Sequence, residues 1–435
     1  MRGDRMTFRN VIIVSPYFPP SGLAGVHRAR HLVKHLPAAG WIPIVLCVDE
    51  AYHEQRLDAA LGALVPLSSE IVKVPALPIA ATACLGLGDI SLRAWPHLAA
   101  GVARLLRSRP NSIVLITGSP FYSMLMTGWI KRRFGAPVIL DFQDPWVSRW
   151  GATQRGLSKA TLSHRLASVL EPRAVRRADF ITSVSDAQNE EMAERYPWLD
   201  RSRMAAIPIG GDPEDFETMR LNTRRESSVE LDATKINLSY VGTVMPRSEP
   251  LMRGLLKALG RLKAREPELV ARLRLHFVGT SNQPNDRTSF QIVPIAVEEG
   301  VGELVVETPQ RVPYVDALSL LTKSDGLLLI GSDEPHYTAS KIYPALMSGR
   351  PYLSLFHRMS SAHAILARAG GGVSLAFSTA RELAALEPEL AAGLRRLATG
   401  PEQFERADPS SYGAYEARAI AQRYAGILDR LAAHA

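Results

Sequence analysis

The strongest constraint on the fold is a repeated alternation of short apolar segments with longer amphipathic ones. The apolar run Val11–Val14 precedes a Pro- and Gly-rich stretch over 15–25, after which apolar residues recur at helical spacing from 26 to 37. A second apolar run covers 42–48. Strand, helix and strand in this order form a βαβ unit, whose two strands lie parallel in one sheet. The sequence therefore predicts an α/β fold built on doubly wound parallel sheets.

The alternation occurs in two regions that are separated by a polar stretch without periodicity. A chain of 435 residues is long enough for two or three domains. We predict two Rossmann-like domains facing each other, at 1–215 and 235–410, a linker at 216–234 and an amphipathic helix within 411–435. The other predicted strands are 113–116, 138–142, 180–184, 236–241, 273–278, 304–307, 326–330 and 351–355, and the other predicted helices are 122–134, 157–177, 187–196, 251–265, 314–323 and 340–347.

Composition excludes several classes of protein. Two cysteines, Cys47 and Cys84, are too few for a disulfide scaffold or a cysteine-rich zinc module. The best candidate for a membrane span, 74–88, is shorter than the about 20 residues that a spanning helix needs, and prolines interrupt it. The first ten residues are too charged for a signal peptide. These features predict a cytoplasmic protein.

The positive charge of the chain is concentrated in its first half. Residues 1–206 contain 25 Lys and Arg against 16 Asp and Glu, whereas the remainder contains 26 against 27. This split predicts an anionic partner, such as the inner face of the cell membrane or a phosphorylated lipid, with a solvated basic face as the alternative. The chain has no zinc finger, RNA-binding aromatic motif or basic-region helix, so we expect no nucleic acid partner.

Two loops of the first region are candidate sites, because ligands of open parallel sheets bind beyond the carboxyl ends of the strands. One loop contains Gly22 and Gly25 ahead of a predicted helix, whose free N–H groups favour an anion, although a plain strand-to-helix turn explains it equally. The other loop contains Asp141, Asp144 and Trp146. Its two carboxylates predict acid–base or recognition chemistry, with an N-cap and a salt bridge as the structural alternative.

A third candidate loop follows the predicted strand at 236–241. Gly242 and Thr243 allow close approach of the backbone to a ligand, and the guanidinium of Arg247 suits bidentate contact with a phosphate. The sequence therefore predicts a phosphate contact at the beginning of the second domain.

The most informative loop follows the apolar strand at 326–330. Thr338 and Ser340 lie where a new helix is expected to begin, and Lys341 falls in its first turn. A lysine in a first turn opposes the helix dipole, so it indicates a bound anion such as a diphosphate, against the alternative of a merely exposed lysine. Pro344 is compatible with this position because N–H groups of a first turn have no intrahelical partner.

The order of these motifs resembles the nucleotide-sugar glycosyltransferases of the GT-B fold, in particular the family-4 retaining enzymes. The resemblance extends from about Val11 to Gly371, and it lies in the order and spacing of the motifs together. The motifs are SPYFPPSGLAGVHRARHLVKHL, DFQDPW, VSDAQNEEM, IPIGGD, YVGTVMPRSEP, HFVGT, VPYVDALSLLTKSD and SKIYPALMSGRPYL.

The resemblance implies a role for each part of the chain. The domain at 1–215 would lie on the acceptor side, the domain at 235–410 would bind the nucleotide sugar, and the helix in 411–435 would pack back on the first domain. Neither a metal nor another cofactor is implied, because basic side chains can hold the phosphates. The residues expected to contact the donor phosphates are Gly22, Gly25, Gly242, Thr243, Arg247, Thr338, Ser340 and Lys341.

Two departures from the family pattern affect the expected catalytic residues. The family usually has two glutamates separated by seven residues, and here His336 and Pro344 occupy those positions. The catalytic-loop histidine of its first domain also has no counterpart, since Thr117–Phe121 stands at that loop. We therefore expect Asp141, Asp144 and Glu334 to be catalytic, and His336 and Tyr343 to contact the donor sugar or nucleoside.

The sequence thus predicts a glycosyltransferase that moves a sugar from a UDP- or GDP-linked donor to a lipid-linked or polysaccharide acceptor, with retention. One alternative is a nucleotide-sugar epimerase of the same fold. Another is a catalytically dead nucleotide-sugar-binding subunit, which the missing glutamates would suit.

Overall fold

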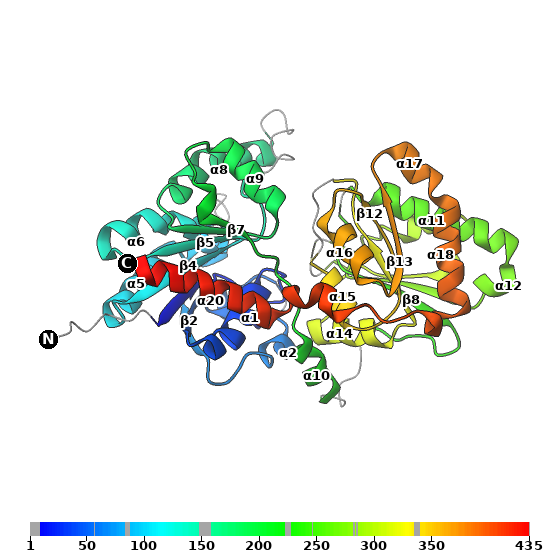
Figure 1. Cartoon of the computed structure of the whole chain (residues 1–435), viewed down its shortest axis with the longest axis horizontal. Coiled ribbons are helices and arrows are strands. Elements are labelled where there is room, and N and C mark those ends of the chain that lie inside the picture. Colours follow the sequence, from blue (N-terminus) through cyan, green and yellow to red (C-terminus); the bar gives the residue numbers. More distant parts are fainter. Residues whose placement is uncertain are drawn as a thin grey trace. The chain divides into compact units, whose positions relative to one another are not determined.

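The computed structural model describes residues 9–55, 57–82, 88–147, 158–221, 228–245, 247–281, 283, 286–334 and 340–434. Contacts within the chain divide it into two compact units (Figure 1). Unit 1 contains Met1–Ile209 and Ala417–Ala435, and unit 2 contains Gly210–Glu416. The corresponding boundaries predicted from the sequence are 215 and 411. The predicted linker at 216–234 begins inside a helix, α10, Pro213–Leu221.

Unit 1 is built on a seven-stranded parallel sheet with the order β3-β2-β1-β4-β5-β6-β7. The strand β1 pairs with both β2 and β4, so the order of the strands reverses direction between β1 and β4. The strand β4 is buried along its whole length, as expected for a parallel strand covered by helices on both faces. The strands are β1 Asn10–Val14, β2 Ile42–Val48, β3 Glu70–Val74, β4 Ser112–Gly118, β5 Val138–Phe142, β6 Phe180–Ser183 and β7 Met204–Ala206.

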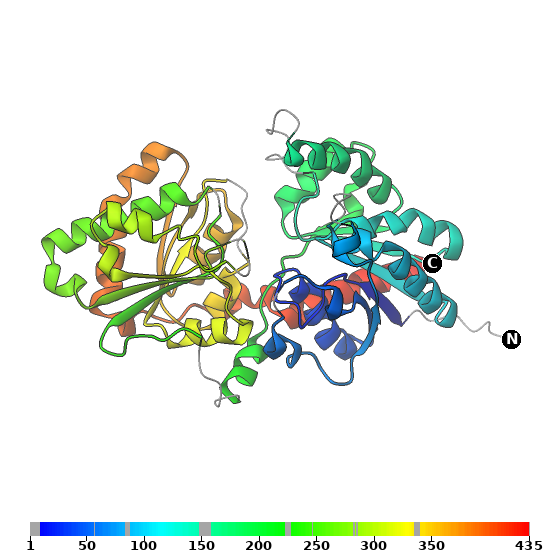
Figure 2. The ribbon, with the colours of Figure 1, turned by 180° about the vertical axis from the view of Figure 1, so that it is seen from behind.

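Helices cover both faces of this sheet. Alternate residues of each strand point to opposite faces, and here both sets are apolar and need to be covered. Val11 and Ile13 lie in a core shared with α1 and α20, whereas Ile12 and Val14 lie in a core shared with α5 and α6. Figure 2 shows the cyan helices in front of the sheet and the red helix α20 behind it. The helices of unit 1 are α1 Val26–His35, α2 Ala59–Gly62, α3 Ile79–Thr82, α4 Ile90–Arg93, α5 Trp95–Ser108, α6 Thr127–Phe134, α8 Lys159–Val175, α9 Asp186–Arg195 and α20 Ala417–His434.

The last helix, α20, packs on unit 1 although the whole of unit 2 precedes it in the sequence. It lies beside α1, and Ile420, Tyr424 and Leu428 on one of its faces are buried. The indole of Trp41 donates a hydrogen bond to Asp429 over 3.0 Å. The chain therefore leaves unit 1 after Ile209 and returns to it at Ala417.

Unit 2 is built on a six-stranded parallel sheet with the order β10-β9-β8-β11-β12-β13. Its strand order also reverses at the centre, between β8 and β11. Helices α11 and α18 share a core with one face, and α14, α15 and α16 share a core with the other. The strands are β8 Ile236–Val241, β9 Leu273–Val278, β10 Val305–Thr308, β11 Gly326–Ile330, β12 Tyr352–His357 and β13 Gly372–Phe377, and the helices besides α10 are α11 Glu249–Arg265, α12 Pro267–Val270, α13 Val293–Glu298, α14 Tyr314–Lys323, α15 Ile342–Met347, α16 Ser361–Ala369, α17 Ala380–Ala385, α18 Glu387–Thr399 and α19 Pro409–Tyr412.

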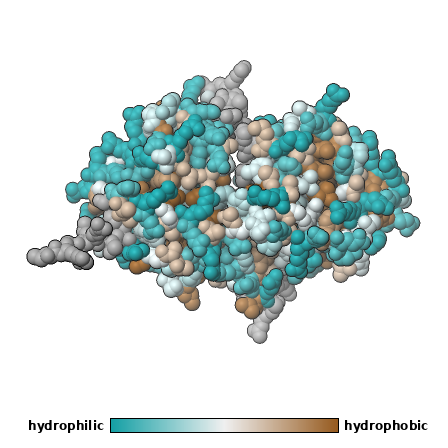
Figure 3. All heavy atoms as spheres, viewed as in Figure 1, coloured by the Kyte–Doolittle hydropathy of each residue, from teal (hydrophilic) through white to brown (hydrophobic). Residues whose placement is uncertain are grey.

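The two parallel sheets confirm the predicted α/β fold with two Rossmann-like units. The strands β3, β7 and β13 were not predicted from the sequence. They lie at sheet edges and are only partly buried, so they lack the apolar run of a central strand. Figure 3 shows that hydrophilic side chains cover most of the face seen there. Within the described part of the chain, no helix combines the length and apolar character that crossing a membrane requires.

Candidate functional site

Each sheet has a topological switch point, where the strand order reverses and the loops of adjacent strands diverge. In open α/β sheets this is the place where ligands bind, beyond the carboxyl ends of the strands. In unit 2 the two loops at this point follow β8 and β11. They contain Gly242, Thr243 and Arg247 on one side, and Ser340 and Lys341 on the other. Five of the predicted phosphate contacts therefore lie on the two loops of one switch point.

Lys341 reaches across from the β11 loop to the end of β8. Its ammonium donates a hydrogen bond to the hydroxyl of Tyr240 over 2.6 Å and lies 3.9 Å from the centre of the Tyr240 ring. The tyrosine hydroxyl in turn donates to the carbonyl of Thr243 over 2.9 Å. This chain of contacts holds the lysine over the loop that follows β8.

The surroundings of Lys341 penalise its positive charge. No carboxylate among the described residues pairs with this lysine, and desolvation lowers its pKa to about 7. The residue as a whole is partly exposed. An anionic ligand would restore the missing countercharge and raise the pKa again. The geometry therefore suits a phosphate group.

The loop after β8 is shaped to pass close to this lysine. Gly242 has a φ of +134°, which side chains rarely adopt, and a Cβ there would lie 3.3 Å from Cδ of Lys341. In the same loop, Nε of Arg247 lies 2.5 Å from a carboxylate oxygen of Asp333, and its Nη1 lies 3.8 Å from Glu334. The two carboxylates of the β11 loop thus compete with any anion for this guanidinium.

The remaining predicted residues of unit 2 differ in their placement. Ser340 and Lys341 precede the helix α15, which begins at Ile342, so Lys341 takes the N-cap position and not the predicted first turn. Because α15 has only six residues, its dipole contributes little. The ammonium of Lys341 is therefore the group that would attract an anion here. Tyr343 is fully buried in the core beside Tyr415, which speaks against its predicted contact with the donor. His336 and Thr338 lie outside the described residues.

In unit 1 three loops meet at the switch point between β1 and β4. The backbone N–H of Gln143, after β5, donates to the carbonyl of Gly118 at the end of β4 over 2.7 Å. A Cβ on Gly25 would lie 3.1 Å from Oε1 of Gln143 and 3.5 Å from the carbonyl of Ser119. Gly25 is therefore explained by packing within the protein. A Cβ on Gly22 would make only an ordinary contact, so its backbone needs no glycine for space.

Asp144 lies in the loop after β5, and its carboxylate is exposed. Its side chain has no hydrogen-bond or ion-pair partner among the described residues, and the protein around it raises its pKa by desolvation. The exposure limits this effect. The turn that carries it is held by Trp146, which stacks on Phe121 with ring centres 5.4 Å apart and meets Tyr122 edge-on. Asp144 therefore has the accessibility that the predicted acid–base role requires.

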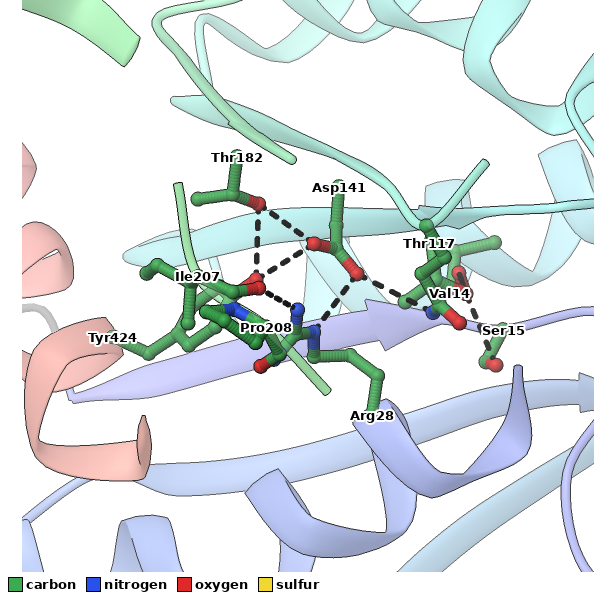
Figure 4. Close-up of polar contacts among 10 residues, drawn as sticks. Val14, Ser15, Arg28, Thr117, Asp141, Thr182, Ile207, Pro208 and Tyr424 are labelled. Carbon is green, nitrogen blue, oxygen red and sulfur yellow. Dashed lines mark hydrogen bonds and ion pairs between the residues drawn. The ribbon is translucent and has the colours of Figure 1, made fainter. Parts of the chain in front are cut away.

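Asp141, by contrast, is fully buried at the centre of a hydrogen-bonded network (Figure 4). One of its oxygens accepts hydrogen bonds from Thr182 over 2.8 Å and from Tyr424 over 2.7 Å. The other accepts from Nε of Arg28 over 3.1 Å and from the amide of Gln143 over 3.3 Å. The geometry favours a structural role for Asp141 over the predicted catalytic one, because both of its oxygens are occupied by protein groups.

Arg28 connects this network to two further segments of unit 1. Its guanidinium donates to the carbonyl of Pro208 over 2.9 Å and to that of Ile207, and it lies over the ring of Tyr424 at 5.1 Å. Desolvation raises the pKa of Tyr424 well above its ordinary value, so its hydroxyl stays protonated. The network therefore joins α1, β5, β6 and α20 to the segment at which the chain leaves unit 1.

Tyr240, Arg28 and Tyr424 were not predicted from the sequence. Tyr240 lies inside an apolar strand, where an aromatic residue is ordinary. An arginine within the apolar face of a predicted helix was the available signal for Arg28, because a buried arginine requires a partner. No local signal marks Tyr424, whose partners are far away in the sequence.

Comparisons with known proteins agree with this architecture. Residues 24–210 match the family model of the glycosyl transferase 4-like domain. A D-inositol 3-phosphate glycosyltransferase of Stackebrandtia nassauensis is 28% identical over 182 residues, which cover 38% of this chain and 40% of that relative. The chain thus spans less than half of the length of this curated relative.

Solved structures match over nearly the whole chain. HepE of Anabaena, solved in complex with UDP-glucose, has a TM-score of 0.60 at 14% identity and covers 97% of this chain and 99% of its own. The UDP-forming α,α-trehalose-phosphate synthase of Burkholderia xenovorans has a TM-score of 0.60 at 10% identity, with coverage of 97% and 100%. At such identities these matches show the fold. The chain has the two-domain GT-B fold, and its first unit is similar to the glycosyl transferase 4-like domain.

Proposed function

We propose that the protein transfers a sugar from a nucleotide diphosphate sugar to a lipid-linked or polysaccharide acceptor, with retention. The observation that carries this proposal is Lys341, a desolvated cation without a carboxylate partner among the described residues, at the switch point of unit 2. A diphosphate suits this position because it supplies the countercharge and lies where the fold binds ligands. Arg247 on the neighbouring loop would contact the same group by two parallel hydrogen bonds.

The chemistry asked of these residues is electrostatic. When the bond between the sugar and the diphosphate breaks, negative charge grows on the leaving phosphate. Lys341 and Arg247 would stabilise that charge, and Gly242 and Thr243 would allow the backbone to approach. Because Arg247 is held by Asp333 and Glu334 in the ligand-free chain, donor binding would have to release it. We further propose Asp144 as an acid–base group and expect the phosphates to need no metal.

The donor and the acceptor are best sought by a panel. UDP is the first nucleotide to test, since HepE was solved with UDP-glucose, and GDP is the second. Acceptors should include lipid-linked sugars, polysaccharides and D-inositol 3-phosphate, which the name of the curated relatives suggests. Release of the nucleoside diphosphate with a glycosylated product indicates a transferase. An isomerised donor would indicate an epimerase, and binding without turnover would indicate a binding subunit.

Lys341→Ala is expected to weaken the binding of UDP or GDP by about 1.5–3 kcal/mol, which is the range for a hydrogen bond to a charged group. The corresponding loss of affinity is about 10- to 150-fold. The ligand-free protein should melt at the same temperature or slightly higher. Folding lowers the pKa of Lys341 to about 7, from about 10.4 in the unfolded chain. Burying the charged lysine therefore costs its full free energy below about pH 7, and this cost declines as the pH rises from about 7 towards about 10.4. Isothermal titration calorimetry and thermal unfolding measure the two effects.

Lys323→Ala is the matched control, because Lys323 is an exposed lysine of the same unit in the last turn of α14. It should leave nucleotide binding unchanged. Normal nucleotide binding by Lys341→Ala together with a lower melting temperature would show that Lys341 is structural and that the phosphates bind elsewhere.

Nucleotide affinity should also depend on pH. Because the free lysine has a pKa of about 7, and a bound diphosphate raises that pKa, binding takes up a proton above neutral pH. The affinity is expected to fall by roughly tenfold per pH unit as the pH rises above 7, the limit for one linked proton. Calorimetric titrations in buffers of different ionisation enthalpy measure the number of protons that are taken up when the nucleotide binds. The permanently charged Lys341→Arg should flatten the profile, and a wild-type affinity independent of pH between 7 and 9 would contradict this linkage.

A further inference from the structure

The helix α8 of unit 1 carries apolar residues on two of its faces. Ala167, Ala174 and Val175 are buried against the unit. On the other side Leu162, Leu166 and Val169 are 52%, 47% and 51% exposed. These three follow one another at spacings of four and three residues, so they form one continuous stripe along the exposed side of the helix.

Basic and aromatic residues extend this stripe. Arg173 and Arg176 continue its spacing towards the end of the helix. The guanidinium of Arg176 lies 4.9 Å from the centre of the Trp198 ring, and Trp198 is itself 43% exposed. From Leu162 to Arg176 the stripe is about 21 Å long, at 1.5 Å per residue. We call this surface, made of Leu162, Leu166, Val169, Arg173, Arg176 and Trp198, the α8 stripe.

The exposed charges of α8 itself have one sign. Residues 158–178 contain five Lys and Arg and one acid, Glu171. Glu171 is fully buried, where it accepts hydrogen bonds from Tyr196, Arg195 and the backbone of Val147. Its carboxylate is therefore bound inside the protein, and the outward-facing charge of the helix is positive.

The basic residues of α6 lie next to this surface. A Cβ on Gly128 would lie 3.6 Å from Nη1 of Arg132 and 3.7 Å from Cδ of Arg177, so these two side chains flank the same glycine. Arg132 of α6 therefore adjoins the C-terminal end of α8. The exposed Asp200 lines the hollow beside Arg176 and Trp198, and it is an acid at one end of this surface. An apolar stripe, a tryptophan and a helix whose exposed charges are positive are the features of a surface that lies in a lipid–water interface.

We propose that unit 1 docks on an anionic lipid bilayer through the α8 stripe. Leu162, Leu166 and Val169 enter the boundary of the acyl chains, Trp198 lies at the level of the headgroups, and the arginines contact lipid phosphates. A second copy of the chain is a poor occupant, because a two-fold interface would set arginines against arginines. The proposal goes beyond the proposed sugar transfer and does not depend on it.

Vesicle binding of the full chain tests this proposal without any assay of transfer. The protein should sediment with vesicles of phosphatidylcholine mixed with phosphatidylglycerol and much less with phosphatidylcholine alone, and salt should weaken the binding. Leu166→Glu should lower the partition coefficient by roughly tenfold or more, because it puts a charge in place of a leucine that enters the bilayer in the proposed complex. The double variant Arg165→Glu/Arg173→Glu reverses the exposed Arg173 of the stripe and the exposed Arg165 beside it on α8. It should lower the partition coefficient by roughly thirtyfold at low salt.

Matched controls come from exposed residues elsewhere in unit 1. Leu67→Glu changes a fully exposed leucine in the segment before β3, and Arg104→Glu/Arg107→Glu reverses two exposed charges on α5. Both should bind vesicles as the wild type does. Lipids with brominated acyl chains should quench wild-type fluorescence more than that of Trp198→Phe, which reports the depth of this residue. All variants change exposed side chains, so their melting temperatures should match that of the wild type.

Four results would overturn the proposal. These are equal binding to neutral and anionic vesicles, no binding to either, full binding by Leu166→Glu, and loss of binding by the α5 variant. Conversion of a dimer to a monomer by Leu166→Glu, with vesicle binding intact, would show that the stripe is an interface between two copies.

Discussion

Asp141→Ala is expected to destabilise unit 1 by about 3–5 kcal/mol, the range for removing one partner of a buried ion pair. The variant leaves the guanidinium of Arg28 buried without its carboxylate, and both residues are fully buried in the native state. It also removes the acceptor of the hydroxyls of Thr182 and Tyr424. The loss should therefore exceed that of any exposed ion pair in the chain's described part.

Tryptophan fluorescence isolates this effect in a two-domain protein. All six tryptophans of the chain occur at or before Trp198, so urea unfolding followed by their emission reports on unit 1 alone. Glu50→Ala is the control, because Glu50 pairs with Lys73 at the surface and its loss should cost about 0–1 kcal/mol. In the double variant Arg28→Met/Asp141→Leu stability should largely return, since no charge stays buried. A cost below that of Glu50→Ala would contradict the structural role assigned to Asp141.

Asp144→Asn is expected to lower the rate of sugar transfer on the order of 100-fold, as for the loss of a general acid or base. The substitution keeps the size of the side chain and removes its charge. Stability should not change, because Asp144 is exposed and makes no hydrogen bond or ion pair with the described residues. The loss should fall on kcat while nucleotide binding stays normal, since Asp144 belongs to unit 1 and the proposed phosphate contacts to unit 2.

Asp186→Asn, at the first turn of α9, is the control for this experiment, because it removes another exposed aspartate of unit 1. The transfer rate and its pH profile should be measured for both variants. If Asp144→Asn transferred sugar at the rate of the control, Asp144 would be left with no more than a role in the turn.

The positions of the central strands follow from the sequence. The predicted strands 42–48, 138–142, 236–241, 273–278 and 326–330 coincide with β2, β5, β8, β9 and β11. Short, mostly apolar segments that alternate with segments of helical periodicity are typical of parallel strands covered on both faces. Because binding loops follow such strands, the sequence also indicated the loops of Arg247, Lys341 and Asp144.

The tertiary structure decided which polar side chains meet. Asp141 is 113 residues from Arg28 and 283 residues from Tyr424, and no local pattern joins them. Two carboxylates three residues apart looked equivalent in the sequence, yet Asp141 points into the protein and Asp144 is exposed. In the same way Lys341 looked like a first-turn lysine, and the fold instead placed it on Tyr240 of another strand.

The physical reason is the range of the interactions involved. Periodicity of apolar residues is a local property, since neighbouring residues of a helix or strand share one face. The partner of a buried charge depends on which distant segments pack around it, and burial makes such a partner obligatory. The sequence by itself therefore determined the alternating strands and helices and the loops that follow the strands. Only the packing of α1, α20 and the two sheets decided which side chains are structural and which stay accessible for chemistry.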